Sequence, residues 1–207
     1  MHKSGIIVFA IAVLALSVAA GAQGLQRSEI SLQVSGLFTS NSNGTPTRHL
    51  ATDSAGLLVG YRFHLTSWEA LEAEYGYTRD GQRYFTPATA VGTPATNFAI
   101  TSNFQELIGN EVITTPRILG TFQFFILGGG GAVMFSPRSG PSTLLLRRQT
   151  RGAFNAGAGF DFHVGHLGAR AEFQMLWFKT PDFRNPALAL NKWTHVSQPS
   201  VGLILTF

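Results

Sequence analysis

The sequence predicts an all-β fold: an eight-stranded antiparallel transmembrane β-barrel with short periplasmic turns and long extracellular loops, preceded by a cleaved signal peptide. Three observations predict it. Apolar and polar residues alternate in several segments, the connections between these segments are alternately long and short, and 44% of the residues are hydrophobic while only 13% are charged. Soluble chains usually have about a quarter charged residues, so much of this surface need not face water. A length of 207 residues suits one domain.

Residues 1–22 have the layout of a secretory signal peptide. Lys3 precedes an apolar stretch of residues 6–20, and the small residues Ala20-Gly21-Ala22 provide a cleavage site. A retained membrane anchor is the alternative, but the apolar stretch is shorter than the roughly 20 residues of a spanning helix. We therefore expect a signal peptide at 1–22 and a barrel domain at 23–207. The chain has no cysteine, so no disulfide stabilises it.

Three segments in the first half of the mature chain alternate with a period of two. One face of each is apolar and suits contact with lipid, while the other is small or polar. The apolar faces consist of Ile30, Leu32, Val34 and Phe38; of Ala55, Leu57, Val59, Tyr61 and Phe63; and of Leu71, Ala73, Tyr75 and Tyr77. Each segment is close to the length of about ten residues that crosses a membrane as a tilted strand.

Two further strands are predicted at residues 98–113 and 119–135. They are apolar on both faces, so the sequence leaves open which of their residues face inward. The second contains Gly128–Gly131. This run lacks the Lys and Ser/Thr of a phosphate-binding P-loop, so we expect the glycines to permit sharp coiling and to free interior volume.

The last three predicted strands alternate clearly again. Their apolar faces consist of Phe154, Ala156, Ala158, Phe160, Phe162 and Val164; of Leu167, Ala169, Ala171, Phe173, Met175 and Trp177; and of Val201, Leu203, Leu205 and Phe207. Aromatic residues near the strand ends suggest two interfacial girdles, with Phe38, Tyr75, Tyr77 and Trp177 at the outer rim and Tyr61, Phe63, Trp68 and Phe207 at the inner rim.

The connections alternate in length. Long polar segments at 40–52, 79–97, 136–149 and 179–194 alternate with short ones at 65–68, 114–118 and 165–166. A membrane barrel with short turns on one rim and long loops on the other shows this alternation of long and short connections, and eight strands place both termini at the short-turn rim. In a soluble β-sandwich, the alternative, nothing requires long and short connections to alternate.

Two hairpins can be set in register. A two-residue turn at Gly165-His166 places Asp161 opposite Arg170, and pairing Phe63 with Leu71 places Arg62 opposite Glu72. Both pairs would point into the lumen, where a lone charge would be poorly hydrated. On a soluble sheet the same pairs would be exposed and contribute about 0 to 1 kcal/mol.

Few residues suggest chemistry. His195 and Ser197 lie on the same side of the last strand, an arrangement that resembles a fragment of the His/Ser pair of outer-membrane lipid A deacylases. No acidic residue follows Asp182 to orient the histidine. The histidines lack metal-ligand spacing, so neither a metal nor another cofactor is expected. Without Lys3, the chain has 14 basic and 11 acidic residues, and the basic residues do not form a stripe. Nucleic acid is therefore not expected as a partner.

One predicted loop is basic. Arg138, Arg147, Arg148 and Arg151 lie in or beside the third long connection. These arginines either face solvent in an ordinary loop or contact the phosphates of lipopolysaccharide. The planar guanidinium group fits the geometry of a phosphate group.

The closing hairpins, "FNAGAGFDFHVGHLGARAEFQMLWFKTPDF" and "PSVGLILTF", resemble those of the OmpA-like or OmpX-like small outer-membrane β-barrels, especially members without a peptidoglycan-binding domain. The resemblance covers residues 150–207 most clearly and 28–135 more loosely. It implies insertion by the β-barrel assembly machinery through the terminal pattern Val201, Leu203, Leu205 and Phe207. It also implies lumenal ion pairs, for which Arg62, Glu72, Asp161, Arg170 and Glu172 are the candidates. No peptidoglycan-binding domain follows Phe207, so a wall-anchoring role does not transfer.

The expected protein is a monomeric, integral outer-membrane barrel with a structural or surface-interaction role and no enzymatic activity. Its expected partners are outer-membrane lipid and lipopolysaccharide. A narrow eight-stranded interior disfavours a broad pore. An outer-membrane lipid-modifying hydrolase, a narrow ion-conducting channel and a soluble exported β-sandwich remain alternatives.

Overall fold

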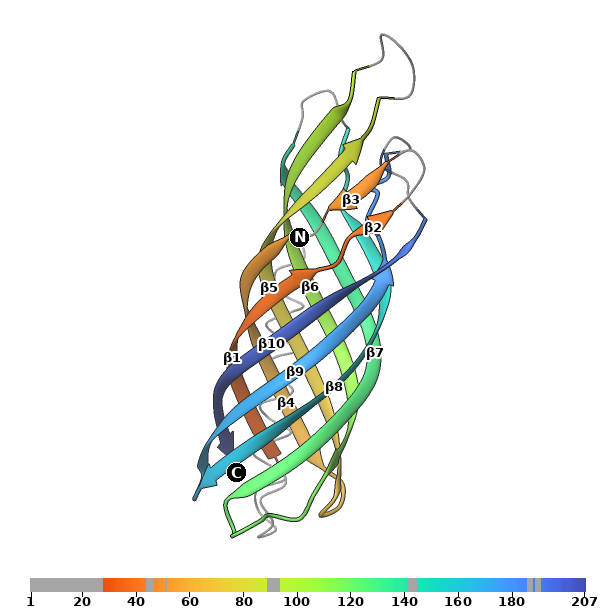
Figure 1. Ribbon diagram of the computed structural model, residues 1–207. Coiled ribbons are helices and arrows are strands. Elements are labelled where there is room, and N and C mark those ends of the chain that lie inside the picture. Colours follow the sequence, from red (N-terminus) through yellow and green to blue (C-terminus); the bar gives the residue numbers. More distant parts are fainter. Residues whose placement is uncertain are drawn as a thin grey trace, which may run out of the picture.

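The computed structural model describes residues 28–43, 47–50, 52–88, 94–140, 145–185, 188 and 191–207, and the predicted signal peptide at 1–22 lies outside them. The described residues form a closed antiparallel barrel (Figure 1). Its strands are β1 (Ser28–Thr39), β4 (Asp53–His64), β5 (Glu69–Thr86), β6 (Thr96–Thr114), β7 (Phe122–Ser139), β8 (Gln149–Val164), β9 (Leu167–Lys179) and β10 (Trp193–Thr206). The short strands β2 (Ser42–Asn43) and β3 (Arg48–Leu50) form a hairpin that extends β5. Among the described residues, no helix is long and apolar enough to cross a membrane.

Neighbouring barrel strands follow the chain order, and the first strand pairs with the last. Val34 of β1 lies opposite Val201 of β10, and Tyr75 of β5 lies opposite Leu107 of β6. The two ends of the described chain meet, because the Ser28 amide donates to the Phe207 carbonyl at 3.1 Å. The predicted closed barrel is therefore confirmed, with every barrel strand paired on both sides.

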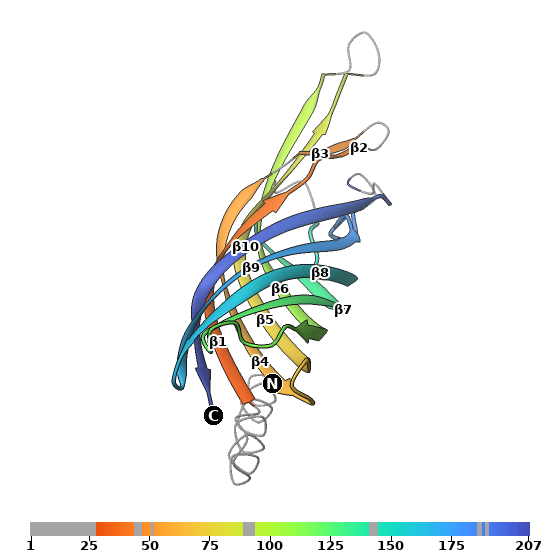
Figure 2. The same cartoon turned by 60° about the horizontal axis from the view of Figure 1, so that its bottom comes forward.

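The barrel has a turn end and a loop end. At the turn end, residues 65–68, 115–121 and 165–166 connect the strands; at the loop end, residues 40–52, 87–95, 140–148 and 180–192 do so. Figure 2 shows the hairpins of the loop end projecting well beyond the barrel wall. The predicted alternation of short and long connections is confirmed.

Several strands are longer than predicted. The segment 79–97, expected to be a polar loop, is mostly a paired extension of β5 and β6, from Arg79 opposite Asn103 to Thr86 opposite Thr96. β7 begins later than predicted, at Phe122 rather than Leu119, but it continues past residue 135 to Ser139. Beyond the lipid, both faces of a hairpin can be polar, so its sequence lacks the alternation that marks a spanning strand.

The outer face of the barrel is apolar and the side chains alternate across the wall. Leu32, Ile126 and Leu203 are 58%, 61% and 70% exposed, whereas their chain neighbours Gln33 and Leu127 are buried in the lumen. Such an outer face suits lipid, and a closed barrel leaves no strand edge unpaired there. The protein is thus built as an integral membrane barrel.

The structure settles the facing of the two strands that the sequence left open. In β6, Phe104 and Ile108 point into the lumen while Leu107 points out. In β7, Phe125 and Leu127 point in while Ile126 points out.

The glycine run of β7 allows β6 and β7 to approach closely. A Cβ atom on Gly129 or Gly131 would lie 2.0 Å from the carbonyl oxygen of Gly109 or Leu107, respectively. Only glycine fits these two inward positions, which agrees with the structural interpretation of Gly128–Gly131.

Candidate functional site

The turn-end half of the lumen holds a buried ion network that joins five strands, β1, β4, β5, β8 and β9. Arg170 binds Asp161 through two hydrogen bonds, Nε to Oδ1 at 2.7 Å and Nη2 to Oδ2 at 2.8 Å. It also reaches Glu72 Oε2 at 3.1 Å and Glu29 Oε2 at 3.0 Å. Arg62 contacts the same Glu72 oxygen at 2.8 Å and Asp161 Oδ2 at 3.2 Å. Both arginines are only 1% exposed, so their charges are compensated by protein groups rather than by bulk water.

The network rests on an aromatic ring. The guanidinium carbons of Arg62 and Arg170 lie 4.3 and 5.1 Å from the ring centre of Phe125. A cation over an aromatic face in a desolvated place is favourable. Phe125 therefore both fills the narrow lumen and supports the two cations.

The fifth predicted residue of the network, Glu172, occupies a different place. None of the ion pairs found among the described residues includes it, and the Gln174 amide donates to its carboxylate instead. The same amide donates to both oxygens of Glu74, at 3.0 and 3.1 Å. Glu72, Glu74 and Glu172 have carboxylate oxygens within 4.8 Å of one another. Of the described residues, these three come close enough to share a cation.

Further polar residues that the sequence did not predict as lumenal partners lie in and beside the network. Glu29 joins the network from β1, and its second oxygen lies 3.1 Å from His64 Nε2. Deeper in the lumen, Gln198 donates to Glu106 at 2.7 Å and Asn155 to Gln174 at 2.7 Å. In the sequence, Glu29 is distinguished only by its place on the polar side of its strand, the side predicted to face the lumen. The pattern of β6 does not show which way Glu106 faces.

A large apolar cluster fills much of the loop-end half of the lumen, beside buried polar side chains that include Asp80, Gln82 and Gln149. The expectation of a polar interior is therefore correct only in part. The reason is that β6 and β7 are apolar on both faces, so one of those faces must fill the lumen. The buried cluster consists of Leu37, Tyr84, Ile100, Phe104, Ile108, Val133, Phe135, Ala153, Leu176, Phe178, Phe183, Leu188 and Val196.

Part of the β9–β10 connection folds back as a plug on this cluster. Phe183 is fully buried, with its ring centre 6.4 Å from that of Phe135, and Leu188 is fully buried as well. Asp182 fixes the plug by accepting from Arg151 Nη2 at 3.0 Å and from Gln149 Nε2 at 2.6 Å. Tyr84 donates to the Pro181 carbonyl at 2.6 Å.

The predicted His/Ser fragment is arranged differently from a catalytic pair. His195 is exposed at the outer face, and its Nδ1 lies 3.2 Å from Ser40 Oγ rather than being paired with Ser197. Ser40 also donates to the His195 carbonyl at 2.9 Å, so this contact joins the end of β10 to the chain just after β1.

The loop end is strongly basic. Of the four arginines predicted there, Arg147 and Arg148 are exposed, Arg151 pairs with Asp182, and Arg138 lies 3.0 Å from the side-chain amide group of Asn103. Six further basic residues share this end: Arg48, Arg79, Arg83, Lys179, Arg184 and Lys192. Ten basic residues thus oppose three acidic ones, Asp53, Asp80 and Asp182. Only the third loop has its charges clustered in the sequence, whereas the other loops contribute theirs from scattered positions.

The terminal strand has the predicted orientation. Val201, Leu203 and Leu205 point outward and are exposed, and Phe207 lies half-buried at the turn end. Insertion through this strand stays a prediction.

No known family model and no curated protein sequence matches the chain. Solved structures of outer-membrane proteins match the chain in fold. The outer-membrane protein OprG from Pseudomonas aeruginosa matches with a TM-score of 0.58 and 12% identity, over 87% of this chain and 95% of that one. Ail, the attachment invasion locus protein of Yersinia pestis, in a complex with the heparin analogue sucrose octasulfate, matches with a TM-score of 0.50 and 15% identity, over 87% of this chain and 99% of that one. The resemblance stated from the sequence is confirmed as a likeness of fold: the chain folds as the small eight-stranded outer-membrane β-barrels do.

Proposed function

We propose that the protein is a closed outer-membrane barrel that binds anionic saccharides at the cell surface through its basic loop end. It neither conducts solutes nor catalyses a reaction. The observation that carries the proposal is the charge of the loop end, where ten basic residues against three acidic ones give a net charge of +7. Clustered arginines favour ligands with several phosphate or sulfate groups, because a guanidinium binds such groups in a bidentate manner.

The filled lumen supports a role at the surface rather than in transport. The ion network fills its turn-end half, and the apolar cluster with the Phe183 plug fills its loop-end half. A steady aqueous path through both layers would require the buried guanidinium groups and the plug to move. We therefore expect no steady conductance in planar bilayers.

Two sources could supply such a ligand: the phosphates of neighbouring lipopolysaccharide, or sulfated glycans of another cell. The complex of Ail with sucrose octasulfate supports the use of that compound as a probe. As further parts of this proposal, the barrel is a monomer and the assembly machinery inserts it through the terminal strand that ends at Phe207.

Binding is tested with the refolded barrel in detergent micelles. Fluorescence anisotropy would follow labelled lipopolysaccharide, and unlabelled sucrose octasulfate would compete. The double variant Arg147→Gln/Arg148→Gln should bind more weakly and with a shallower salt dependence, because exposed charges act through a screened field. The charge-conserving variant Arg147→Lys/Arg148→Lys should keep the salt dependence of the wild type but bind more weakly than it, because lysine cannot make the bidentate contact.

Arg117 provides the matched control, since it is exposed at the turn end, far from the basic surface. Arg117→Gln should bind like wild type. Displacement of lipopolysaccharide by sucrose octasulfate would identify sulfate as an equivalent ligand, and failure to displace it would assign the surface to lipopolysaccharide. Wild-type protein that binds neither compound at low salt would refute the proposal.

A further inference from the structure

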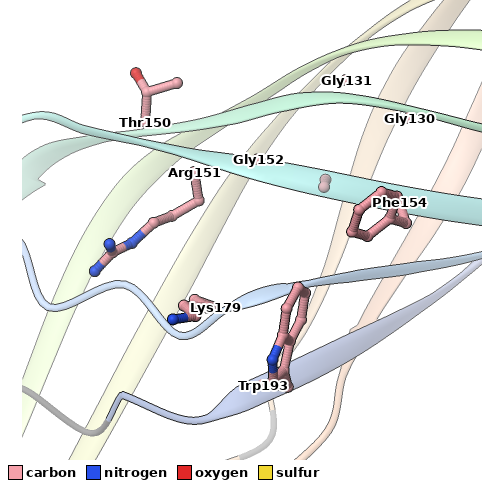
Figure 3. A pocket seen from close by; sticks show the side chains of 9 residues that line it. Gly130, Gly131, Thr150, Arg151, Gly152, Phe154, Lys179 and Trp193 are labelled. Atoms are coloured by element: carbon pink, nitrogen blue, oxygen red, sulfur yellow. The ribbon is translucent and has the colours of Figure 1, made fainter.

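A groove lies on the outward face of the barrel wall, close to the loop end, where β7 to β10 run side by side. Its volume is about 570 Å³, and its lining includes Gly130, Arg151, Gly152, Phe154, Lys179 and Trp193 (Figure 3). The strand register explains its position. Gly130 lies opposite Phe154, Ala132 lies opposite Gly152, and Lys179 lies opposite Trp193.

The floor of the groove is formed by outward positions that lack side chains. A Cβ atom on Gly152 would have no heavy atom within 4 Å, and one on Gly130 would have only the Ala153 carbonyl at 3.2 Å and the Phe154 ring at 3.5 Å. On a lipid-facing wall, these positions would ordinarily carry apolar side chains. Their absence leaves a hollow that an acyl chain can fill.

One wall of the groove is aromatic. Phe154 and Trp193 are 63% and 54% exposed, and their rings stack with centres 6.4 Å apart and an interplanar angle of 29°. Tryptophan is favoured at the boundary between lipid and water. The groove therefore lies at the depth where acyl chains end and headgroups begin.

The rim of the groove is basic. Lys179 is exposed, and in Figure 3 it lies next to Trp193, whereas the Arg151 side chain points away from the aromatic pair. Arg151 forms an ion pair with Asp182 at 3.0 Å, so Lys179 is the main cation available to a ligand. A phosphate at this height would meet a lysine directly above an apolar hollow.

We propose that this groove binds one lipid A molecule of the outer leaflet, with an acyl chain over Gly130 and Gly152 and a phosphate on Lys179. Lipid A joins acyl chains to phosphates on a disaccharide, which matches a hollow at the boundary of lipid and water below a basic loop end. The inference rests on the outer-membrane location contained in the proposed function. It does not require the loops to bind a saccharide.

Native mass spectrometry of the detergent-solubilised barrel with added lipid A tests the proposal. The wild type should retain one lipid A per barrel and should prefer it to phosphatidylglycerol. Gly152→Leu should lose most of this binding because its side chain fills the floor. Gly81→Leu is the matched control, since a Cβ atom on that strand glycine also meets nothing within 4 Å.

The charge at the rim is tested in the same way. Lys179→Gln should weaken lipid A binding by about ten-fold, the effect of losing one charge-assisted contact. Lys192→Gln, at the end of the connection that follows Lys179, should leave lipid A binding unchanged. An electrophoretic heat shift confirms that each variant is folded. Equal lipid A retention by Gly152→Leu and wild type, or equal retention of phosphatidylglycerol and lipid A by the wild type, would overturn the proposal.

The two proposals can fail separately. Sucrose octasulfate should not displace lipid A from the groove, because it has no acyl chain. A barrel that floats with liposomes but retains no lipid A would refute the groove alone. A barrel that fails to enter any lipid or detergent would refute the membrane location itself.

Discussion

Arg170 and Asp161 face each other across β8 and β9 and form a two-pronged ion pair in the lumen, with both N–O distances below 3 Å. The same arginine reaches Glu72 and Glu29 from other strands. One side chain thus connects three carboxylates from different parts of the barrel wall.

Arg170→Ala should lower the free energy of unfolding by about 3 to 5 kcal/mol, because it leaves buried carboxylates without a partner. A urea titration of the barrel folded in detergent micelles, followed by heat-shift electrophoresis, measures this. Arg117→Ala, at an exposed arginine of the turn end, should change the midpoint little. A midpoint for Arg170→Ala equal to that of wild type would show that the pair does not stabilise the fold.

Gly131→Ala should impair folding, since its Cβ atom would lie 2.0 Å from the Leu107 carbonyl oxygen and would push β6 and β7 apart. Overpacking of this kind costs about 1 to 3 kcal/mol or more. The yield of heat-shifted protein after refolding is the measurement. Gly128→Ala, in the same glycine run, should fold normally because the nearest atom lies 3.9 Å away. Equal yields of the two variants would contradict the close approach.

Phe183→Ala should loosen the plug. The lost ring leaves a cavity beside Phe135, and burying a phenylalanine contributes about 3 to 5 kcal/mol relative to alanine. The variant should show faster protease cleavage within residues 180–192 and a lower urea midpoint. Arg184→Ala, at the exposed neighbouring residue, should keep the wild-type cleavage rate. Unchanged cleavage in Phe183→Ala would mean that the Phe183 ring does not hold the plug in place.

The hairpin of β2 and β3 should loosen as the pH falls. Burial lowers the pKa of His49 below its ordinary value of 6.5, although a hydrogen bond to Gln82 acts in the opposite direction. The folded hairpin therefore binds protons less well than the open one, so its stability is complete above pH 6.5 and decreases as the pH falls below that value.

Hydrogen exchange of the β3–β5 pairing, from Arg48 opposite Phe85 to Leu50 opposite Arg83, measures this opening between pH 7.5 and 5. After correction for the intrinsic pH dependence of amide exchange, the exchange rate of these amides should rise on acidification in the wild type. In His49→Gln it should rise much less. The same pH profile in both proteins would assign the opening to another group.

Local sequence patterns predict the closed all-β fold, the facing of six strands, and the registers that place Asp161 opposite Arg170 and Arg62 opposite Glu72. These follow from a period of two and from short turns, which act between residues close in the chain. The remaining features depend on contacts between segments far apart in the chain. Phe104, Ile108 and Phe135 face inward because β6 and β7, apolar on both faces, must supply one face to the lumen. Glu29 joins Arg170 only because barrel closure brings β1 beside β10, and the basic loop end and the lipid A groove likewise assemble from segments far apart in the chain.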